Sequence, residues 1–375
     1  MEDRELFFAL LNTPSITPQD GGLLAFIEDY LPGFTAQRLD IGDVRNLFLY
    51  KKFGNGPHFC FAGHVDVVPP GDDWDSDPFE PVEKDGFVYA RGAQDMKSGV
   101  CAILQACKSI TGFNGTISVL LTSDEEGEAE NGTVKVLEFL KSENFLPDFA
   151  LVAEPTCVKN FGDTIKIGRR GSINGKIEIR GVQGHVAYPQ NAKNPIHQVS
   201  FILPKIAEHK FDDGDDVFEP SMLTITDIRS GEGVTNVTPK TLTLMFNIRN
   251  SPLTKIENVE RYLKSNFGLL YMVNHPGKDK LDFDLELKES AKPFLTDKSS
   301  ILIAYLSRVI EDVTGFVPEL SASGGTSDAR FFAEFGVSTV EFGVLNDTIH
   351  ATNERCYLSH LYDLTKVYKE LLAKF

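Results

Sequence analysis

Two histidines and several carboxylates in this chain are of the types that bind metal ions, and nearly all of them follow an apolar, strand-like segment. They are His64, Asp66, Asp95, Glu125, Glu126, Glu154 and His350. In an open α/β sheet, catalytic groups gather beyond the carboxyl ends of the strands, so residues distant in sequence can meet at one edge. Imidazole and carboxylate together suit zinc-type ions, and several carboxylates suggest more than one ion. The pattern predicts a metallohydrolase.

The segment GHVDVVPPGDDW carries the first pair of these residues. His64 and Asp66 are two positions apart, so their side chains point to the same side of an extended segment. A carboxylate beside a metal-bound imidazole would fix its tautomer. An ordinary strand end with a solvated Asp is the competing interpretation. The long Pro/Gly/Asp loop that follows favours a site, because such loops commonly line one.

The remaining carboxylates have structural alternatives as well. Asp95 begins a predicted amphipathic helix, where Asp often serves as N-cap, yet its two oxygens could also bridge two ions. Three consecutive acids, Asp124 to Glu126, follow a buried strand and repel one another, which suggests a cation or a shared proton. Neighbouring residues there point in different directions, so one could bind metal while the other acts as base. Taken singly, Glu154 and His350 are more often structural. They become candidate metal ligands because other residues of the right types also follow strands.

Basic residues near the middle of the chain are candidates for binding an anionic substrate. Arg169 and Arg170 could grip a carboxylate, which arginine does with two parallel hydrogen bonds. The turn SGGTSDARF precedes a helix and offers backbone N–H groups and Arg330 to an anion. Surface arginines without a ligand are the alternative.

The bulk composition narrows the class of protein. A chain of 375 residues is long enough for two domains, and a net charge of −17 argues against nucleic acid as a partner. The five cysteines form no C-x-x-C pair and are expected to be buried free thiols. The N-terminal segment MEDRELFFALL lacks the basic start of a signal peptide, and no apolar run reaches the length of a membrane span. We therefore expect a cytoplasmic protein with no membrane contact.

The apolar pattern predicts the α/β class for most of the chain. FCFAG, ISVLL, FALVA and STVEFGV are continuous apolar runs, typical of strands in a sheet that helices cover on both faces. Four helical faces could cover it. They are Leu6/Phe7/Leu10/Leu11, Leu24/Ile27/Leu31, Leu302/Tyr305/Leu306/Val309 and Leu364/Val367/Tyr368/Leu371. We predict a mixed, mainly parallel sheet.

Strict alternation of apolar and polar residues replaces these runs in the middle of the chain, which predicts an antiparallel sheet with one wet face. Two helical stretches, Asn194–His209 and Thr254–Phe267, fall between its strands and give a ferredoxin-like β-α-β-β-α-β order. We interpret residues 172–291 as a domain inserted into a catalytic domain formed by residues 1–171 and 292–375. A free edge strand there could pair with its symmetry mate, so a homodimer through this domain is expected.

At these segments the sequence resembles the cocatalytic zinc peptidase and amidohydrolase family. The matching segments are GHVDVVPPGDDW, RGAQDMKSG, TSDEEG, AEPT, GRRGSI, GVQGHVAYP with NPIH, SGGTSDARF and LNDTIHATNE, and they run from about residue 60 to residue 355. The resemblance implies a zinc-peptidase-like catalytic domain, an inserted dimerisation domain and an N-acyl amino acid as substrate. Within the family, the branch that acts on a succinylated diamino acid is closer than the deacetylase branch.

The resemblance also implies a role for each metal-ligating position. His64 and Glu154 would bind one zinc ion, Glu126 and His350 would bind a second, and Asp95 would bridge them. Two Zn²⁺ per subunit are therefore expected, although Co²⁺ or Mn²⁺ could use the same ligands.

Further residues would act on the substrate, according to the same resemblance. Asp66 would support His64, Glu125 would be the general base, and His185 would stabilise the oxyanion in the active site of the partner subunit. Substrate contacts are implied for Arg169, Ser172, Asn236, Arg249, Gly325, Thr326 and Asn346.

Alternatives from the same and from other classes stay open. An acetylated amino acid or a small peptide could be the substrate of the same chemistry, and a catalytically silent metal-binding protein would keep the fold. Retention of Glu125 together with all the expected ligands favours an enzyme. Nothing in the sequence favours a phosphatase-type dinuclear site.

Overall fold

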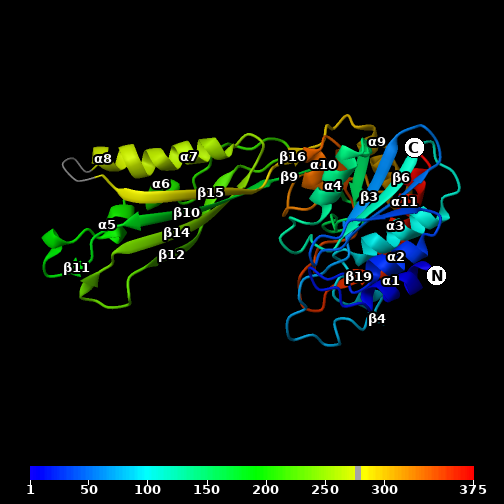
Figure 1. Cartoon of the computed structure of the whole chain (residues 1–375), viewed down its shortest axis with the longest axis horizontal. Coiled ribbons are helices and arrows are strands. Elements are labelled where there is room, and N and C mark those ends of the chain that lie inside the picture. Colours follow the sequence, from blue (N-terminus) through cyan, green and yellow to red (C-terminus); the bar gives the residue numbers. More distant parts are fainter. Residues whose placement is uncertain (275–279) are drawn as a thin grey trace. The chain divides into compact units, whose positions relative to one another are not determined.

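The chain forms two compact units in the computed structural model, which describes residues 1–274 and 280–375 (Figure 1). Unit 1 comprises residues 1–168, 295–322 and 327–375, and unit 2 comprises residues 169–294 and 323–326. No helix in the described part of the chain is long and apolar enough to cross a membrane.

Unit 1 is built on a mixed eight-stranded sheet. In spatial order the strands are β1 (Thr35–Arg38), β2 (Asn46–Lys52), β6 (Thr116–Thr122), β3 (His58–His64), β7 (Phe149–Val152), β18 (Ser338–Glu341), β8 (Thr164–Lys166) and β17 (Glu319–Ser321). The four central strands β6, β3, β7 and β18 are mutually parallel, and β1 and β2 run antiparallel at one edge. The predicted α/β class and mainly parallel sheet are confirmed.

The apolar runs form these central strands because both faces of the sheet are buried. Phe59 and Phe61 of β3 belong to the main hydrophobic core, whereas Cys60 and Ala62 point to the other face and are equally buried. A strand with two buried faces loses the polar alternation of a half-wet strand, which is the pattern seen in the sequence. All five cysteines are buried and free, as expected.

Helices cover the sheet of unit 1. They are α1 (Asp3–Leu11), α2 (Leu23–Tyr30), α3 (Lys97–Ser109), α4 (Thr133–Ser142), α9 (Ile301–Thr314), α10 (Ala329–Glu334) and α11 (Leu358–Leu372). Helix α3 packs against α1 and α11, and α4 packs against α10. The four predicted apolar faces lie on α1, α2, α9 and α11 and are mostly buried. A separate small sheet contains β4 (Val82–Lys84), β5 (Phe87–Tyr89) and β19 (Arg355–Tyr357).

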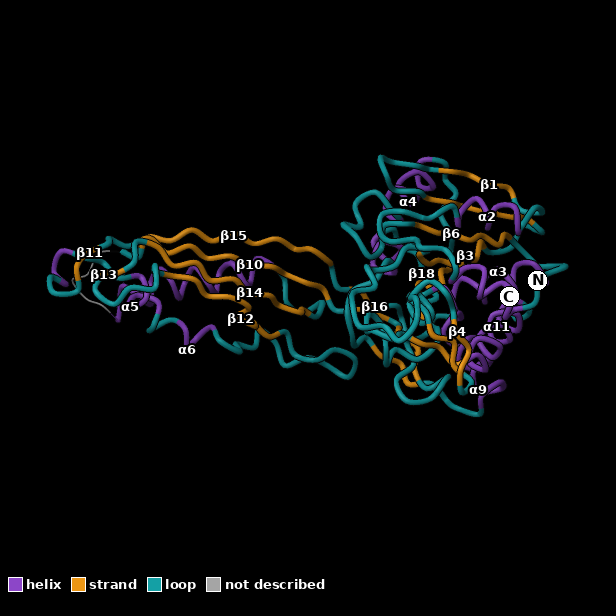
Figure 2. Tube along the Cα trace, turned by 90° about the horizontal axis from the view of Figure 1, so that it is seen from below, coloured by secondary structure: helices purple, strands orange, loops and turns teal. Residues whose placement is uncertain are grey.

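Unit 2 is a four-stranded antiparallel sheet with helices on one face (Figure 2). The sheet has the order β12 (Met222–Ser230), β14 (Thr241–Asn250), β10 (Gly171–Arg180) and β15 (Asp282–Ala291). A glycine is required at position 175, since a Cβ there would lie 1.9 Å from the Phe246 ring on the neighbouring strand. The expected one-sided burial is present, because alternate residues of β10 and β14 are buried.

The helices and short strands of unit 2 complete the β-α-β-β-α-β order. They are α5 (Pro195–Val199), α6 (Leu203–Ile206), α7 (Ile256–Lys264), a π-helix (Ser265–Leu270), α8 (Tyr271–Asn274), a 3₁₀ turn (Pro189–Asn191) and the paired strands β11 (Gly184–His185) and β13 (Val237–Thr238). Strands β9 (Gly168–Arg169) and β16 (Phe294–Leu295) lie where the chain passes between the two units.

One predicted helix is wrong in its extent. The stretch Asn194–His209 was expected to be continuous, but it forms the two short helices α5 and α6. Pro204 lacks an N–H and its ring clashes with the carbonyl four residues earlier, so it fits only in the first turn of a new helix. It occupies that first turn in α6.

Candidate metal centre

The candidate ligands lie beyond the ends of the four neighbouring parallel strands of unit 1. His64 is the last residue of β3, Glu125 and Glu126 follow β6, Glu154 follows β7, and His350 lies in the loop after β18. Because these strands are parallel neighbours, their carboxyl ends share one edge of the sheet (Figure 1). The seven predicted metal-site residues therefore converge, and Asp95 reaches the same point from the loop before α3.

Asp95 lies between the two histidines. Its Oδ1 is 3.2 Å from His64 Nε2, and its Oδ2 is 3.5 Å from His350 Nε2. Helix α3 has Met96 as its N-cap residue and no side-chain cap, so Asp95 does not serve the capping role that its position in sequence allowed. A carboxylate with one oxygen directed at each imidazole has the geometry of a bridging ligand.

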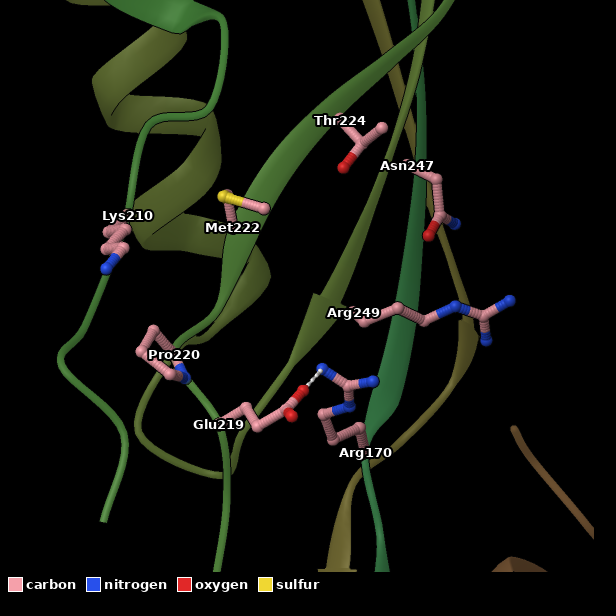
Figure 3. A pocket seen from close by; sticks show the side chains of 8 residues that line it. All are labelled: Arg170, Lys210, Glu219, Pro220, Met222, Thr224, Asn247 and Arg249. Carbon is pink, nitrogen blue, oxygen red and sulfur yellow. Dashed lines mark hydrogen bonds and ion pairs between the residues drawn. The ribbon is translucent and has the colours of Figure 1, made fainter. Parts of the chain in front are cut away.

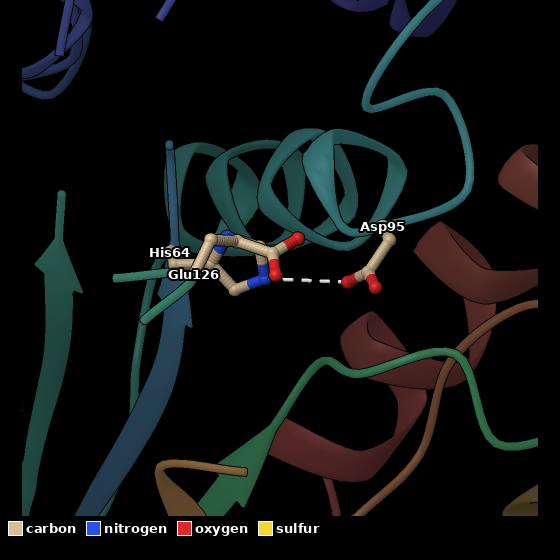
Figure 4. A group of neighbouring side chains, drawn as sticks. All are labelled: His64, Asp95 and Glu126. Atoms are coloured by element: carbon tan, nitrogen blue, oxygen red, sulfur yellow. Dashed lines mark hydrogen bonds and ion pairs between the residues drawn. The ribbon is translucent and has the colours of Figure 1, made fainter. Parts of the chain in front are cut away.

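Each histidine has a further carboxylate beside it. His350 Nε2 is 2.9 Å from Glu126 Oε1, and His64 Nε2 is 3.9 Å from Glu154 Oε1. In two groups, one ligand atom from each residue lies within 4.8 Å of the others: His64, Asp95 and Glu126 (Figure 4), and His64, Glu125 and Glu154. Geometry thus allows Glu125 as a ligand as well as a proton carrier, and its role as base stays a prediction.

The chemistry of this donor set fits divalent cations. Glu154 Oε1 is buried and has no hydrogen-bond partner among the described residues. Burial raises the pKa of Glu154 well above its ordinary value, and the nearby charges of Asp95 and Glu125 raise it further. Burial likewise raises the pKa of Glu125. Buried acids held this close together need positive charge beside them, and metal ions supply it.

Nearby carboxylates, Asp95 among them, favour the protonated form of both histidines. Burial opposes the charged form of His64, but hydrogen bonding to Asp95 and the charges of nearby acids outweigh it, so the pKa of His64 is raised well above its ordinary value. Hydrogen bonds to Asp95 and Glu126 raise the pKa of His350 to about 10. A site that favours a proton on each imidazole this strongly also favours a metal cation in its place.

Asp66 orients His64 mainly through its backbone. His64 Nδ1 lies 2.8 Å from the Asp66 carbonyl oxygen and 3.6 Å from its carboxylate. A carbonyl only accepts, so Nδ1 carries a proton, and Nε2, which points at Asp95, is the nitrogen on which a metal ion would replace the other proton. The Asp66 carboxylate accepts the backbone N–H of Glu126 at 3.1 Å and thereby fixes the segment that carries Glu125 and Glu126.

Several of the predicted substrate contacts lie together in unit 2. Ser172 of β10 is paired in register with Arg249 of β14, and Arg169 Nη1 donates to the Gly325 carbonyl at 3.4 Å. Thr326 belongs to the same short segment, 323–326, as Gly325. Asn346 lies in unit 1, where its backbone N–H donates to the Cys157 carbonyl at 3.0 Å.

A cationic pocket of about 360 Å³ surrounds Arg249 (Figure 3). Its lining residues are Arg170, Lys210, Glu219, Pro220, Met222, Thr224, Asn247 and Arg249. Arg170 pairs with the exposed Glu219 at 2.9 Å, whereas the guanidinium of Arg249 has no hydrogen bond or ion pair with the described residues. Burial and the charge of Arg170 lower the pKa of Arg249. The pocket therefore offers an unpaired guanidinium to an anion.

His185 and Asn236 lie at the opposite end of unit 2 from Arg249. The backbone N–H of Val186, next to His185, donates to the Asn236 carbonyl at 3.2 Å. Strands β11 and β13 lie beyond the end of the sheet at which β10 finishes, whereas Ser172 and Arg249 lie where β10 begins (Figure 2). Ten strand residues, at ~3.3 Å each, separate the two ends by roughly 30 Å.

Glu354 and Arg91 were not among the predicted site residues. Both are fully buried or nearly so, and they form an ion pair of 2.7 Å beneath the loops that carry Asp95 and His350. The only signal in the sequence was their position inside the segments RGAQDMKSG and LNDTIHATNE.

Comparison with known proteins matches residues 60–374 to peptidase family M20/M25/M40. The chain belongs to this family. It is 56% identical over 375 residues to the succinyl-diaminopimelate desuccinylase of a Nitratiruptor species, covering all of both chains. It is 51% identical over 372 residues to the desuccinylase of Sulfurimonas denitrificans, covering 99% of each.

Solved structures share the fold of this M20/M25/M40 member. Aminopeptidase PepT from Bacillus cereus aligns with a TM-score of 0.80 at 19% identity and covers 99% of this chain and 97% of its own. The YXEP protein of Bacillus subtilis, described as a dinuclear metal-binding peptidase, aligns with a TM-score of 0.73 at 14% identity, covering 99% and 97%. The zinc-peptidase-like fold expected from the sequence is confirmed.

Proposed function

We propose that this chain hydrolyses the amide bond of N-succinyl-L,L-2,6-diaminopimelate to succinate and L,L-2,6-diaminopimelate. The observation that carries this proposal is the identity of 56% over the full length of both chains to a succinyl-diaminopimelate desuccinylase. The convergence of histidine and carboxylate ligands at one sheet edge supports a metal-dependent hydrolase. The reaction belongs to the synthesis of diaminopimelate and lysine, and we propose that it takes place in the cytoplasm.

We propose that two zinc ions bind per subunit, with Co²⁺ or Mn²⁺ as alternatives. His64 and Glu154 would hold one ion and Glu126 and His350 the other, in keeping with the distances of 3.9 Å and 2.9 Å within these pairs. Asp95 would bridge the ions through its two oxygens. Bound ions would polarise the amide carbonyl and lower the pKa of a water molecule.

Glu125 is proposed as the general base. It lies in the loop after β6 and offers a carboxylate oxygen within 4.8 Å of ligand atoms of His64 and Glu154. It would accept a proton from the attacking water at its carboxylate oxygen and return it to the leaving amine nitrogen. Asp66 would hold this segment in place through the backbone N–H of Glu126.

The arginines of unit 2 are proposed to recognise the charge of the substrate, which has three carboxylates. Arg249 has no ionic partner among the described residues and faces the cationic pocket, and Arg169 lies beside Gly325. The neighbouring residues Ser172, Gly325 and Thr326, with Asn346 of unit 1, would contribute polar contacts. Arginine suits this task in an acidic protein because it binds carboxylates with two hydrogen bonds.

The enzyme is proposed to act as a homodimer through unit 2. His185 and Asn236 lie roughly 30 Å from Arg249 along the unit 2 sheet, so one chain does not bring these predicted substrate contacts together. A second copy would resolve this separation if His185 and Asn236 reached the active site of the partner. His185 would then donate to the developing oxyanion there.

The experiment for this mechanism is Glu125→Gln. Loss of the base is expected to lower kcat for N-succinyl-L,L-diaminopimelate at least about 100-fold, while the zinc content stays unchanged. Glu128→Gln is the matched control, because Glu128 is an exposed acid three residues further along the same segment. Wild-type turnover by the Glu125→Gln variant would refute the role of Glu125 as base.

A further inference from the structure

Glu354 has a buried carboxylate whose hydrogen bonds all come from the loop that carries Asp95. Its Oε1 accepts the backbone N–H of Gln94 at 2.8 Å and of Asp95 at 3.0 Å. Its Oε2 accepts the backbone N–H of Gly92 at 3.0 Å and Arg91 Nη1 at 2.7 Å. The side chain is completely shielded from solvent. One carboxylate therefore sets the path of the backbone immediately before the candidate bridging ligand.

Arg91 extends this contact to two other loops. Its Nη1 also donates to the Ala351 carbonyl at 3.2 Å, next to His350, and its Nη2 donates to the Pro70 carbonyl at 3.1 Å, in the loop after His64 and Asp66. The guanidinium lies 5.2 Å from the centre of the Trp74 ring. The Arg91–Glu354 pair thus joins the three loops that bear His64, Asp95 and His350.

Gln94 forms a second connection between the loops of Asp95 and His350. Its amide nitrogen donates to Asp347 Oδ1 at 2.8 Å, and its amide oxygen accepts the backbone N–H of Thr348 at 2.7 Å. His350 itself has a φ of 58°, a left-handed backbone that a non-glycine residue adopts only when its surroundings hold it. Neighbouring contacts therefore determine where its imidazole points.

We propose that Glu354, together with Arg91, is the positioning group that directs Asp95 and His350 toward the metal ions. The inference rests on the metal-binding roles proposed above. A buried ion pair is a poor source of stability, because desolvation cancels much of its attraction. Residues that orient metal ligands, by contrast, typically change metal affinity 10–100-fold when they are altered. Glu354 accepts four hydrogen bonds from one short loop, as expected of a residue that orients metal ligands.

The substitution Glu354→Gln tests the proposal with almost no change in volume. Whichever way the new amide turns, its NH₂ group faces two N–H donors, so two of the four hydrogen bonds are lost. We expect the affinity of the metal-stripped full-length chain for Zn²⁺ to fall about 10–100-fold, measured by competition with a chromophoric chelator. The absorption spectrum of the Co²⁺-loaded protein should also change, because it reports ligand geometry.

The matched control is Asp163→Asn. Asp163 also lies in unit 1 and accepts three backbone N–H groups, from Val158, Lys159 and Asn160, and none of its hydrogen bonds within the described chain involves the loops of His64, Asp95 or His350. Its replacement should lower thermal stability and leave Zn²⁺ affinity and the Co²⁺ spectrum unchanged. This comparison separates a positioning role from general loss of stability.

If Glu354→Gln fails to fold, Arg91→Lys gives the same test, because lysine keeps the charge but cannot span both the Ala351 and Pro70 carbonyls with two nitrogens. Reduced Zn²⁺ affinity in a folded variant supports the proposal. Wild-type affinity in the folded variants, even with a lower melting temperature, would overturn it. Failure of the wild-type chain to bind Zn²⁺ would contradict the proposed function and this inference together, since the measurement needs no substrate.

Discussion

Asp95 is the residue at which the two halves of the candidate metal centre meet. From the sequence, its position before a helix allowed either a cap or a bridge, and helix capping is the commoner use of Asp there. The structure directs one oxygen at His64 and the other at His350. Those two distances favour the bridging interpretation, which stays a prediction, and no spacing within the segment could have indicated it.

His58 provides a pH-dependent test outside the candidate metal centre. It is buried on β3, its Nε2 lies 2.8 Å from Ser118 Oγ, and burial lowers the pKa of His58 to about 4. Below pH 6.5 the unfolded chain binds a proton at this residue that the folded chain does not, so stability is lost as the pH falls from 6.5 towards 4. Between pH 7.5 and pH 5 this amounts to about 2 kcal/mol.

The measurement is the free energy of unfolding of His58→Gln against wild type at pH 7.5 and pH 5. Glutamine keeps a polar partner for Ser118 and does not titrate, so the variant should lose less stability on acidification. His197→Gln, at an exposed position, is the control and should retain the wild-type slope. Equal slopes for His58→Gln and wild type would show that His58 does not carry this effect.

At the scale of helices and strands, the apolar runs were sufficient to predict the part of the sheet that matters most for the candidate site. FCFAG, ISVLL, FALVA and STVEFGV correspond to β3, β6, β7 and β18, which are neighbours in space. Parallel strands buried on both faces leave a strong signal in sequence. Because ligands gather at the carboxyl ends of such strands, locating the strands also located most of the candidate ligands.

Helices and strands that lack a clear apolar pattern in the sequence were missed or predicted with the wrong ends. The three-residue strands β8 and β17 are too short to show a period, and Pro204 divides a stretch that was expected to be one helix. Helix α3 was expected to be amphipathic but is buried along most of its length. Glu354 could not be found by spacing, since its role depends on backbone N–H groups that any sequence supplies.

At the scale of the whole molecule, the predicted substrate contacts fall into separate regions of one chain. Ser172 and Arg249 lie at one end of the unit 2 sheet, and His185 and Asn236 lie beyond the other. This separation is what motivates the proposed homodimer, in which each active site would combine unit 1 of one chain with His185 of the partner. The alternation in residues 172–291 indicated a second sheet. It could not indicate whether residues of that sheet contribute to the active site of their own chain or of a partner subunit.

Mixing two inactive variants tests this arrangement. Glu125→Gln and His185→Ala should each be strongly impaired alone, whereas a mixed dimer contains one site with an intact Glu125 and an intact His185 from the partner. Random exchange at equal amounts makes half of the dimers mixed, with one working site of two, so about a quarter of wild-type activity should return. Mixed dimers that form without any recovery would exclude a contribution from the partner.

The central claim is that the chain is a metal-dependent desuccinylase, and a substrate panel with metal removal tests it most directly. Initial rates would be measured on N-succinyl-L,L-diaminopimelate, N-acetylornithine and a dipeptide, before chelation, after chelation and after Zn²⁺ is returned. We expect dominant release of succinate, its loss on chelation and its recovery when Zn²⁺ is returned. Dominant turnover of N-acetylornithine or the dipeptide, or no turnover of any substrate by the Zn²⁺-loaded chain, would contradict the central claim.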